Sequence, residues 1–332
     1  FAGPVGVGKR TAAEALARYF LCHKPRPGTA GAGATLTPEQ FPRACGRCPS
    51  CVTFDAGSHP DFHVVYRQLI RIEKKDSKAR DLSADVIREY LVAPAQHTAQ
   101  LNNGKVFVVK EAELMNATAQ NSLLKTLEEP PGKCLIVLLT DSPAYLLSTI
   151  RSRSQLLLFR ALDRETVSRE LARRDVGVSD AAHAARYAAG SLGLALRWLE
   201  DGVIAQAREL EDRLTALVSG RGGGDLPDWF KKSAYAYAGK QLVRDELYSR
   251  DQANKEGLLL FLKLAAEFFR GQLVATSEPD DHERACDAID AILLTETYLD
   301  ANVTVSVFLQ QLVGSLEAKY SRREAGASRA LI

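Results

Sequence analysis

The sequence has little net charge, no long apolar run and no visible secretory signal. Its 43 Lys and Arg residues nearly balance 41 Asp and Glu, leaving a formal net charge of +2. A charge this small does not by itself predict a strongly nucleic-acid-binding surface. No apolar run approaches the roughly 18 residues of a membrane span, and no leader peptide is recognisable. What remains is a globular chain of 332 residues, long enough for two or three domains and expected in the cytoplasm.

Cysteine is scarce and unevenly placed. Cys45, Cys48 and Cys51 follow the spacing C-x2-C-x2-C. Three thiolates at this spacing can bind one face of a tetrahedral Zn²⁺, and in a cytosolic-looking chain they favour a metal over disulfides. Cys22 is the expected fourth ligand, and the alternative is a set of free thiols. The competing fourth ligands are His23, His59 and His63.

A phosphate-binding loop is predicted at the start of the sequence. Residues 3–9 read GPVGVGK, which matches G-x(4)-G-K. The glycines let backbone N–H groups wrap a phosphate, and Lys9 reaches its β and γ oxygens. The Ser or Thr that should come next and bind Mg²⁺ is Arg10, and Thr11 stands one position late. No strand precedes this loop, so we expect the sequence to start inside a longer domain. The candidate nucleotide-binding residues are Gly3, Gly6, Gly8, Lys9, Arg10 and Thr11.

The stretch 105–140 predicts the centre of a P-loop ATPase core. Residues 106–109 are a β-branched run typical of a buried parallel strand, a helix is expected from Asn116, and residues 135–140 form a second strand. In such cores an Asp after the first strand holds Mg²⁺ and a following Glu activates the attacking water. Those positions are Lys110 and Glu111. The metal-binding carboxylate is missing, as is the hydroxyl of the loop, so no ATP hydrolysis is predicted.

Two further strands are expected at residues 62–66 and 155–159, which would give a doubly wound parallel sheet of at least four strands. The charged stretch 67–80 is interpreted as a solvated loop, and the Gly/Ala/Pro-rich stretch 24–37 as a flexible insertion. From residue 163 onward the pattern is helical. Segments 164–174, 180–189 and 192–200 predict a three-helix unit, and longer helices follow up to residue 316.

Several motifs resemble those of bacterial clamp-loader subunits of the AAA+ class. Residues 123–131 read LLKTLEEPP, Ser-Arg-Ser follows at 152–154, and a four-cysteine module follows the first helix. These features narrow the resemblance to the delta-prime and tau/gamma families of DNA polymerase III. An active tau/gamma subunit keeps Ser or Thr after the loop lysine, Asp-Glu after the second strand and Arg in a Gly-Ser-x-Arg pattern. This sequence has Arg10, Lys110 and Gly193 at those places, which points to delta-prime.

The resemblance implies an α/β P-loop AAA+ core with a parallel sheet and a zinc-binding insertion, followed by an all-α lid and an all-α collar. The expected boundaries are 1–161 for the core, with the zinc module at about 22–51, then 162–201 for the lid and 202–332 for the collar. The implied role is a non-hydrolysing stator that helps tau/gamma and delta subunits load a sliding clamp onto primed DNA. ATP binding would be weak or absent.

Two functional residue sets follow from this resemblance. Arg153 would act in trans as an arginine finger on ATP held by a neighbouring subunit. The collar would assemble the ring, and the last helix carries more apolar residues than one face needs. Some of these residues are expected at an interface: Val303, Val305, Val307, Leu309 and Leu312.

Two other functions compete with this interpretation. One is an active clamp-loader ATPase of the tau/gamma type, which would need Mg²⁺ held without an oxygen from position 10 or 110. The other is a zinc-dependent nucleic-acid-binding module. The second is disfavoured because only Arg43 and Arg47 are basic in the immediate neighbourhood of the cysteine triad.

Overall fold

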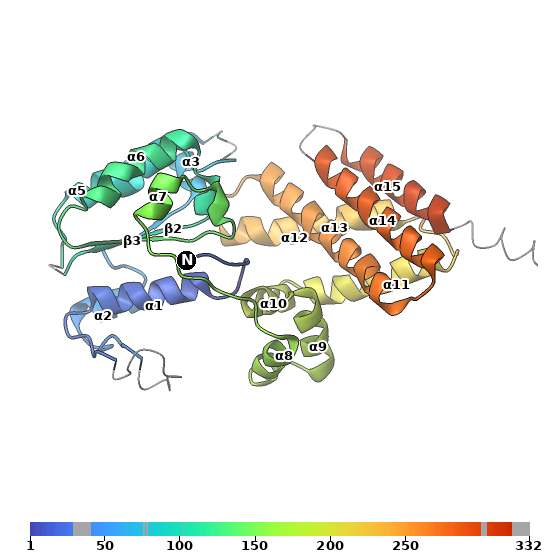
Figure 1. The fold of residues 1–332 in the computed structure, drawn as a ribbon, viewed down its shortest axis with the longest axis horizontal. Helices are drawn as coiled ribbons and strands as arrows, with labels where there is room; N and C mark the ends of the chain where they lie inside the picture. The colour runs from blue at the N-terminus through green and yellow to red at the C-terminus, as the bar shows by residue number, and fades with distance from the viewer. Residues whose placement is uncertain (29–40, 76, 78, 102, 300–303, 321–332) are drawn as a thin grey trace, which may run out of the picture. The chain divides into compact units, whose positions relative to one another are not determined.

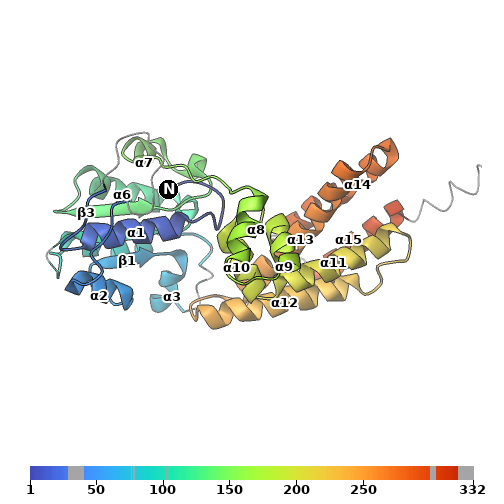
Figure 2. The ribbon, with the colours of Figure 1, turned by 90° about the horizontal axis from the view of Figure 1, so that it is seen from below.

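The computed structural model describes residues 1–28, 41–75, 77, 79–101, 103–299 and 304–320. The chain divides into two compact units (Figures 1 and 2). The α/β unit comprises residues 1–163 and 190–194, and the helical unit comprises 164–189 and 195–332. The predicted boundaries at residues 161 and 201 stay predictions. From residue 29 onward, the flexible insertion predicted over 24–37 lies outside the described residues.

The α/β unit is built on a parallel sheet, in which the described residues form three strands in the order β1–β2–β3. All five residues of β2 are buried, as its β-branched run predicted, because helices cover both faces of such a sheet. Phe107 of β2 lies opposite His63 of β1 and Ile136 of β3. The strands are β1 (Phe62–Val65), β2 (Lys105–Val109) and β3 (Cys134–Leu138).

The prediction of a strand over residues 155–159 is wrong, because this segment forms a single bridge and no regular strand. This segment joins the sheet only through Ala2, which forms parallel bridges to Thr140 on one side and Leu158 on the other. The Phe159 N–H donates to the Ala2 carbonyl at 2.7 Å. Because only Ala2 pairs with this segment, the hydrogen bonds cannot continue along it as they do between two strands. The phosphate loop therefore leaves the sheet from between two of its extended segments.

Helix α1 packs one face of the sheet (Figure 1). Its Ala13 and Ala17 are fully buried in a cluster with Val106 and Val108 of β2. On α6, the predicted N-cap is confirmed, since Asn116 Oδ1 accepts from the Ala119 N–H at 2.9 Å. The α/β unit contains α1 (Lys9–Leu21), α2 (Pro49–Asp55), η2 (Arg67–Leu69), α3 (Ile70–Glu73), α4 (Ala84–Ile87), η3 (Arg88–Val92), α5 (Ala93–Gln96), η4 (Ala112–Leu114), α6 (Ala117–Glu128), η5 (Pro143–Tyr145) and α7 (Ser148–Ser152).

The helical unit packs long helices against one another, and its helix order agrees with the predicted one. Ion pairs join its parts: Arg186 pairs with Glu211 at 3.0 Å, and the buried Asp201 pairs with Arg244 at 2.8 Å. Within the described residues, no helix is long and apolar enough to cross a membrane. The helices are α8 (Arg164–Ala172), α9 (Val178–Tyr187), α10 (Leu192–Glu200), α11 (Val203–Val218), α12 (Leu226–Arg244), α13 (Arg250–Ala275), α14 (Pro279–Tyr298) and α15 (Val305–Tyr320).

Some apolar residues of the last helix are predicted to lie at an interface, and the structure divides them into buried and exposed residues. Leu309 and Leu312 are buried in the core of the helical unit, whereas Val307 is 55% exposed. Val303 lies outside the described residues. On the preceding helix, Leu293 and Leu294 are about half exposed. The surplus of apolar surface in this unit is therefore carried by α14 as well as by α15.

Candidate functional site

The phosphate loop has the backbone that its glycines predict. Gly3, Gly6 and Gly8 have φ angles of 151°, 74° and 98°, and such values strain any residue with a Cβ. Gly8 directly precedes α1, so the loop leads into a helix N-terminus, where unpaired N–H groups favour an anion. The backbone of a phosphate cradle is therefore present.

Lys9 is turned onto its own loop. Its Nζ donates to the carbonyl oxygen of Gly3 and, at 2.8 Å, to that of Pro4. Burial lowers the pKa of Lys9, while the nearby carboxyl groups of Asp141 and Glu113 raise it. The ammonium already has protein oxygens as partners, and a phosphate would have to displace them.

A second contact holds the loop through the segment Gly190–Leu194. The Gly193 N–H donates to the Gly6 carbonyl at 3.0 Å. A Cβ added at Gly193 would lie 2.7 Å from that carbonyl oxygen, closer than real Cβ contacts allow. Gly193 occupies the place where a tau/gamma lid carries arginine, and here the glycine permits a close approach of two backbones.

The two positions at which the sequence predicts that Mg²⁺ ligands are missing carry cations with partners of their own. Arg10 pairs with Glu14 at 2.6 Å on the exposed side of α1. Lys110 places its Nζ over the Tyr66 ring, 4.8 Å from the ring centroid. Thr11 is exposed on the helix. None of these side chains supplies an oxygen ligand in the arrangement that phosphoryl transfer requires.

Glu111 is held by Arg67, a residue that the sequence interpretation placed in a solvated loop. Arg67 Nε lies 3.0 Å from Glu111 Oε2, and the Arg67 side chain is only 10% exposed. Glu111 itself has a left-handed backbone with φ of 49°. A carboxylate paired with a guanidinium is a weaker base. A topological signal existed, because Arg67 and Glu111 follow neighbouring parallel strands, whose carboxyl ends share one edge.

Arg153 stands at the end of α7 and is held by two groups. Its Nη1 donates to the Thr149 carbonyl at 3.2 Å, and its Nη2 lies 2.5 Å from Oε1 of Glu128, the last residue of α6. The side chain stays 38% exposed. The start of α7 is fixed as well, because the Leu147 N–H donates to Gln120 Oε1 at 2.7 Å. The sequence predicted a role for Arg153, which stays a prediction, and gave no indication of its contact with Glu128.

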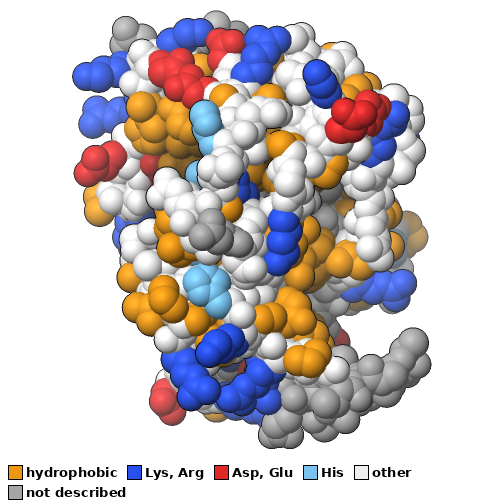
Figure 3. Space-filling model, turned by 90° about the vertical axis from the view of Figure 1, so that its left-hand side faces the viewer, with side chains coloured by type: hydrophobic (Ala, Val, Ile, Leu, Met, Phe, Trp, Pro, Cys, Tyr) orange, Lys and Arg blue, Asp and Glu red, His pale blue; other side chains and the backbone are white. Residues whose placement is uncertain are grey.

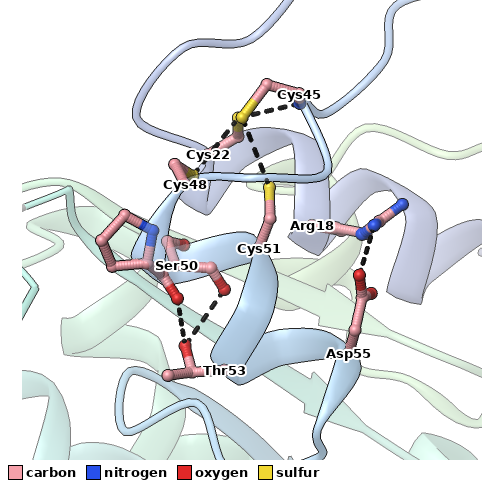
Figure 4. A network of polar contacts seen from close by, with 9 residues as sticks. Arg18, Cys22, Cys45, Cys48, Ser50, Cys51, Thr53 and Asp55 are labelled. Carbon is pink, nitrogen blue, oxygen red and sulfur yellow. Dashed lines mark hydrogen bonds and ion pairs between the residues drawn. The ribbon is translucent and has the colours of Figure 1, made fainter.

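The four cysteines of the predicted metal site meet in one cluster. Their sulfur atoms all lie within 4.8 Å of one another, and Figure 4 shows them converging from the end of α1 and the start of α2. The Sγ atoms of Cys22 and Cys48 are 3.9 Å apart, and those of Cys45 and Cys51 are 4.0 Å apart. Four sulfurs so arranged are the donor set that a tetrahedral Zn²⁺ prefers. The cluster could hold a metal ion.

The electrostatics of the cluster suit a cation. The backbone N–H of Arg47 lowers the pKa of Cys45 to about 6, whereas burial raises the pKa of Cys51 to about 12. A thiol that loses its proton readily therefore lies beside one that holds it, and a bound divalent cation would favour the thiolate form of each. The backbone N–H of Cys45 also donates to Cys22 Sγ at 3.2 Å.

The competing histidines have other partners. His59 Nε2 lies 2.8 Å from Ser50 Oγ, and His59 Nδ1 accepts from the Asp61 N–H at 3.1 Å. Both ring nitrogens of His59 are thus engaged. His63 stacks on Phe107, with ring centroids 4.8 Å apart, and His23 Nε2 lies 3.1 Å from the Leu101 carbonyl oxygen.

These features fit a P-loop module of the AAA+ class, in which the side chains predicted at the nucleotide and Mg²⁺ positions contact other residues of the chain. Residues 1–163 match the family model described as "DNA polymerase III, delta subunit". Over residues 1–163, just under half of its length, the chain is similar to the delta-prime family of DNA polymerase III subunits, and one relative with that name aligns along nearly the whole chain.

Three relatives, all named DNA polymerase III subunit delta', illustrate the match. The protein of Pseudomonas aeruginosa is 38% identical over 151 residues, 46% of this chain and 39% of that protein. The Escherichia coli K12 protein is 35% identical over 205 residues, 61% of this chain and 54% of the relative. The Bacillus subtilis protein is 28% identical over 331 residues, 96% of this chain and 89% of the relative. The chain thus matches less than two-thirds of the length of the first two.

Proposed function

We propose that this protein is a non-hydrolysing subunit of the bacterial clamp loader in the cytoplasm. In this role it helps tau/gamma and delta subunits place the sliding clamp on primed DNA, and its fixed fold serves as a stator. The observation that carries the proposal is the loss of both Mg²⁺ ligands to cations, Arg10 and Lys110, which have other partners. The surviving Glu111 is neutralised by Arg67. An active ATPase of the tau/gamma type is not favoured.

The direct test is ATP hydrolysis by the isolated chain. We expect no single-turnover cleavage of radiolabelled ATP, because neither a positioned Mg²⁺ nor a free carboxylate base is available. The variant Arg10→Thr/Lys110→Asp is expected to remain inactive while Arg67 still holds Glu111. Stoichiometric hydrolysis by the wild-type chain that disappears in Lys9→Ala would contradict the proposal, whereas weak nucleotide binding alone would not.

The metal of the cysteine cluster is inferred to be a structural Zn²⁺ held by Cys22, Cys45, Cys48 and Cys51. Four thiolates close the coordination sphere and leave no open position for chemistry. Its role would be to staple the segment before α2 to the end of α1.

The contribution of this subunit to catalysis is inferred to be Arg153, donated to ATP on a neighbouring subunit. The partly exposed guanidinium, fixed by Glu128 and the Thr149 carbonyl, supports this role. A planar, permanently charged fork matches several phosphate oxygens better than a lysine would.

Ring assembly is inferred to use the collar over residues 202–332. Leu293 and Leu294 of α14 are 51% and 52% exposed, and adjacent apolar residues left in water favour a protein interface. We expect Leu293→Asp/Leu294→Asp to abolish co-purification with tau/gamma and delta, because a buried unpaired carboxylate is costly. Val178→Asp changes an 85% exposed residue of α9 and should leave assembly intact. A normal complex with the double variant would exclude this face of α14.

A further inference from the structure

Backbone pairing brings basic residues from two sides of the cysteine module together. Arg26 and Arg43 form an antiparallel bridge, in which the Arg26 N–H donates to the Arg43 carbonyl at 2.8 Å and the Arg43 N–H donates back at 3.0 Å. Residues that exchange both hydrogen bonds stand directly opposite and project their side chains on the same side of the pair. Two arginines seventeen positions apart in the sequence therefore become neighbours.

The surroundings of this bridge are strongly basic. In the described residues 18–28 and 41–55 there are five Lys and Arg side chains and one acidic residue, Asp55. Asp55 pairs with Arg18 at 2.5 Å. Lys24, Arg26 and Arg47 are exposed and form no ion pair within the described part of the chain. Figure 3 shows Lys and Arg side chains gathered at the lower end of this face of the molecule.

The positive charge exceeds what the cysteine cluster needs. Four thiolates around one Zn²⁺ carry two net negative charges. The module has five cations and one carboxylate over the same described residues, a surplus of four positive charges. Two of these would balance the cluster, so two remain for a partner that is itself anionic.

An exposed aromatic residue is close to these charges in the sequence. Phe41 is 50% exposed and stands two residues before Arg43. Exposed aromatic rings next to arginines are the elements with which proteins hold unpaired bases, since every base offers a face for stacking and every nucleotide a phosphate.

We propose that Lys24, Arg26, Phe41, Arg43 and Arg47, here called the basic face, bind single-stranded nucleic acid. The cationic side chains would contact successive phosphates, and Phe41 would stack on a base. A single strand suits the basic face better than a duplex, because bases stacked within a duplex do not expose their faces for stacking on Phe41. A phosphodiester strand suits it better than an acidic peptide, because guanidinium groups bind phosphate in a bidentate manner and the ring needs a planar partner.

The experiment measures binding of fluorescently labelled oligothymidylate of about 20 nucleotides to the full chain by anisotropy across a salt series. Phosphate contacts by Lys24, Arg26 and Arg47 predict a slope of log K against log salt of about −2, and Arg26→Ala/Arg47→Ala should reduce it to about −0.7. Phe41→Ala should weaken binding roughly 5- to 150-fold with little change in slope. The metal content of each variant reports whether the module is intact.

The matched control is Arg160→Ala/Arg164→Ala, which removes the same charge from two exposed arginines elsewhere and should bind like wild type. Equal weakening by both double variants, or salt-independent affinity, would overturn the proposal. Binding of a labelled polyglutamate peptide tests the alternative that the partner is an acidic protein. If it binds more tightly than the oligonucleotide and is indifferent to Phe41→Ala, the face belongs to an acidic protein partner and the nucleic-acid proposal fails.

Discussion

Arg153→Ala is expected to give a clamp loader that assembles normally but hydrolyses ATP slowly and loads clamps poorly. A guanidinium that reaches a neighbour's γ-phosphate stabilises the charge of the transition state, and fingers supplied in trans accelerate GTPases by roughly 10³–10⁵. Only the site that receives Arg153 should lose this factor, so the total rate should fall by that site's share. The measurement is clamp- and DNA-stimulated ATPase activity of a reconstituted complex, together with clamp loading.

Two controls separate the finger from its surroundings. Arg151→Ala removes a neighbouring exposed arginine and should have no effect on loading. Glu128→Gln breaks the 2.5 Å pair that orients Arg153 and should lower kcat partway with little change in KM. The matched variant Glu129→Gln should be silent. Normal loading by Arg153→Ala would remove Arg153 from the mechanism, and a silent Glu128→Gln beside an impaired Arg153→Ala would reject only the positioning role.

Cys48→Ser is expected to release the metal and loosen the cysteine module. Structural Zn²⁺ binds zinc-finger peptides with an apparent free energy of about 10–16 kcal/mol, much of which is folding free energy. Cys48 directly precedes α2, so losing its bond to the metal should detach the start of that helix from the end of α1. Elemental analysis should find one zinc per wild-type chain and none in the variant, and limited proteolysis should cut before residue 55.

Cys286→Ser is the matched control, because Cys286 is an exposed free cysteine on α14 and should leave the zinc content unchanged. Zinc retained in Cys48→Ser would contradict the assignment. Loss of zinc in His59→Ala, with the protein still folded, would replace one sulfur ligand by an imidazole.

Local signals predicted the parts of the fold that local physics controls. The β-branched run of β2 is buried at all five positions, and the side chain of Asn116 caps α6. Residues 155–159 carry the same apolar signal, yet 156, 157 and 158 are exposed leucines. These residues lack a long enough partner strand, and their own sequence does not show how long the neighbouring segment of the sheet is.

Most residues of the predicted metal site are close in the sequence, and only Cys22 is remote from the other three ligands. The pair of Arg67 with Glu111 and the pair of Arg153 with Glu128 join residues from separate elements. Their contact depends on how strands and helices stack, so periodicity could not reveal it. The same holds for Arg26, which looked remote from the cysteines until its backbone paired with Arg43.

The contact between Gly193 and Gly6 would make the proposed loss of ATPase function hard to reverse. An arginine at position 193 would place its Cβ 2.7 Å from the Gly6 carbonyl oxygen, so this substitution is harmful unless the loop has already moved. Moving the loop first breaks the hydrogen bond between Gly193 and Gly6 and brings no benefit while position 193 lacks a side chain. Two steps that are harmful singly and useful only together show sign epistasis. Replacing arginine by glycine at position 193 creates no clash, whereas the reverse substitution does, so the change is easier in one direction than in the other.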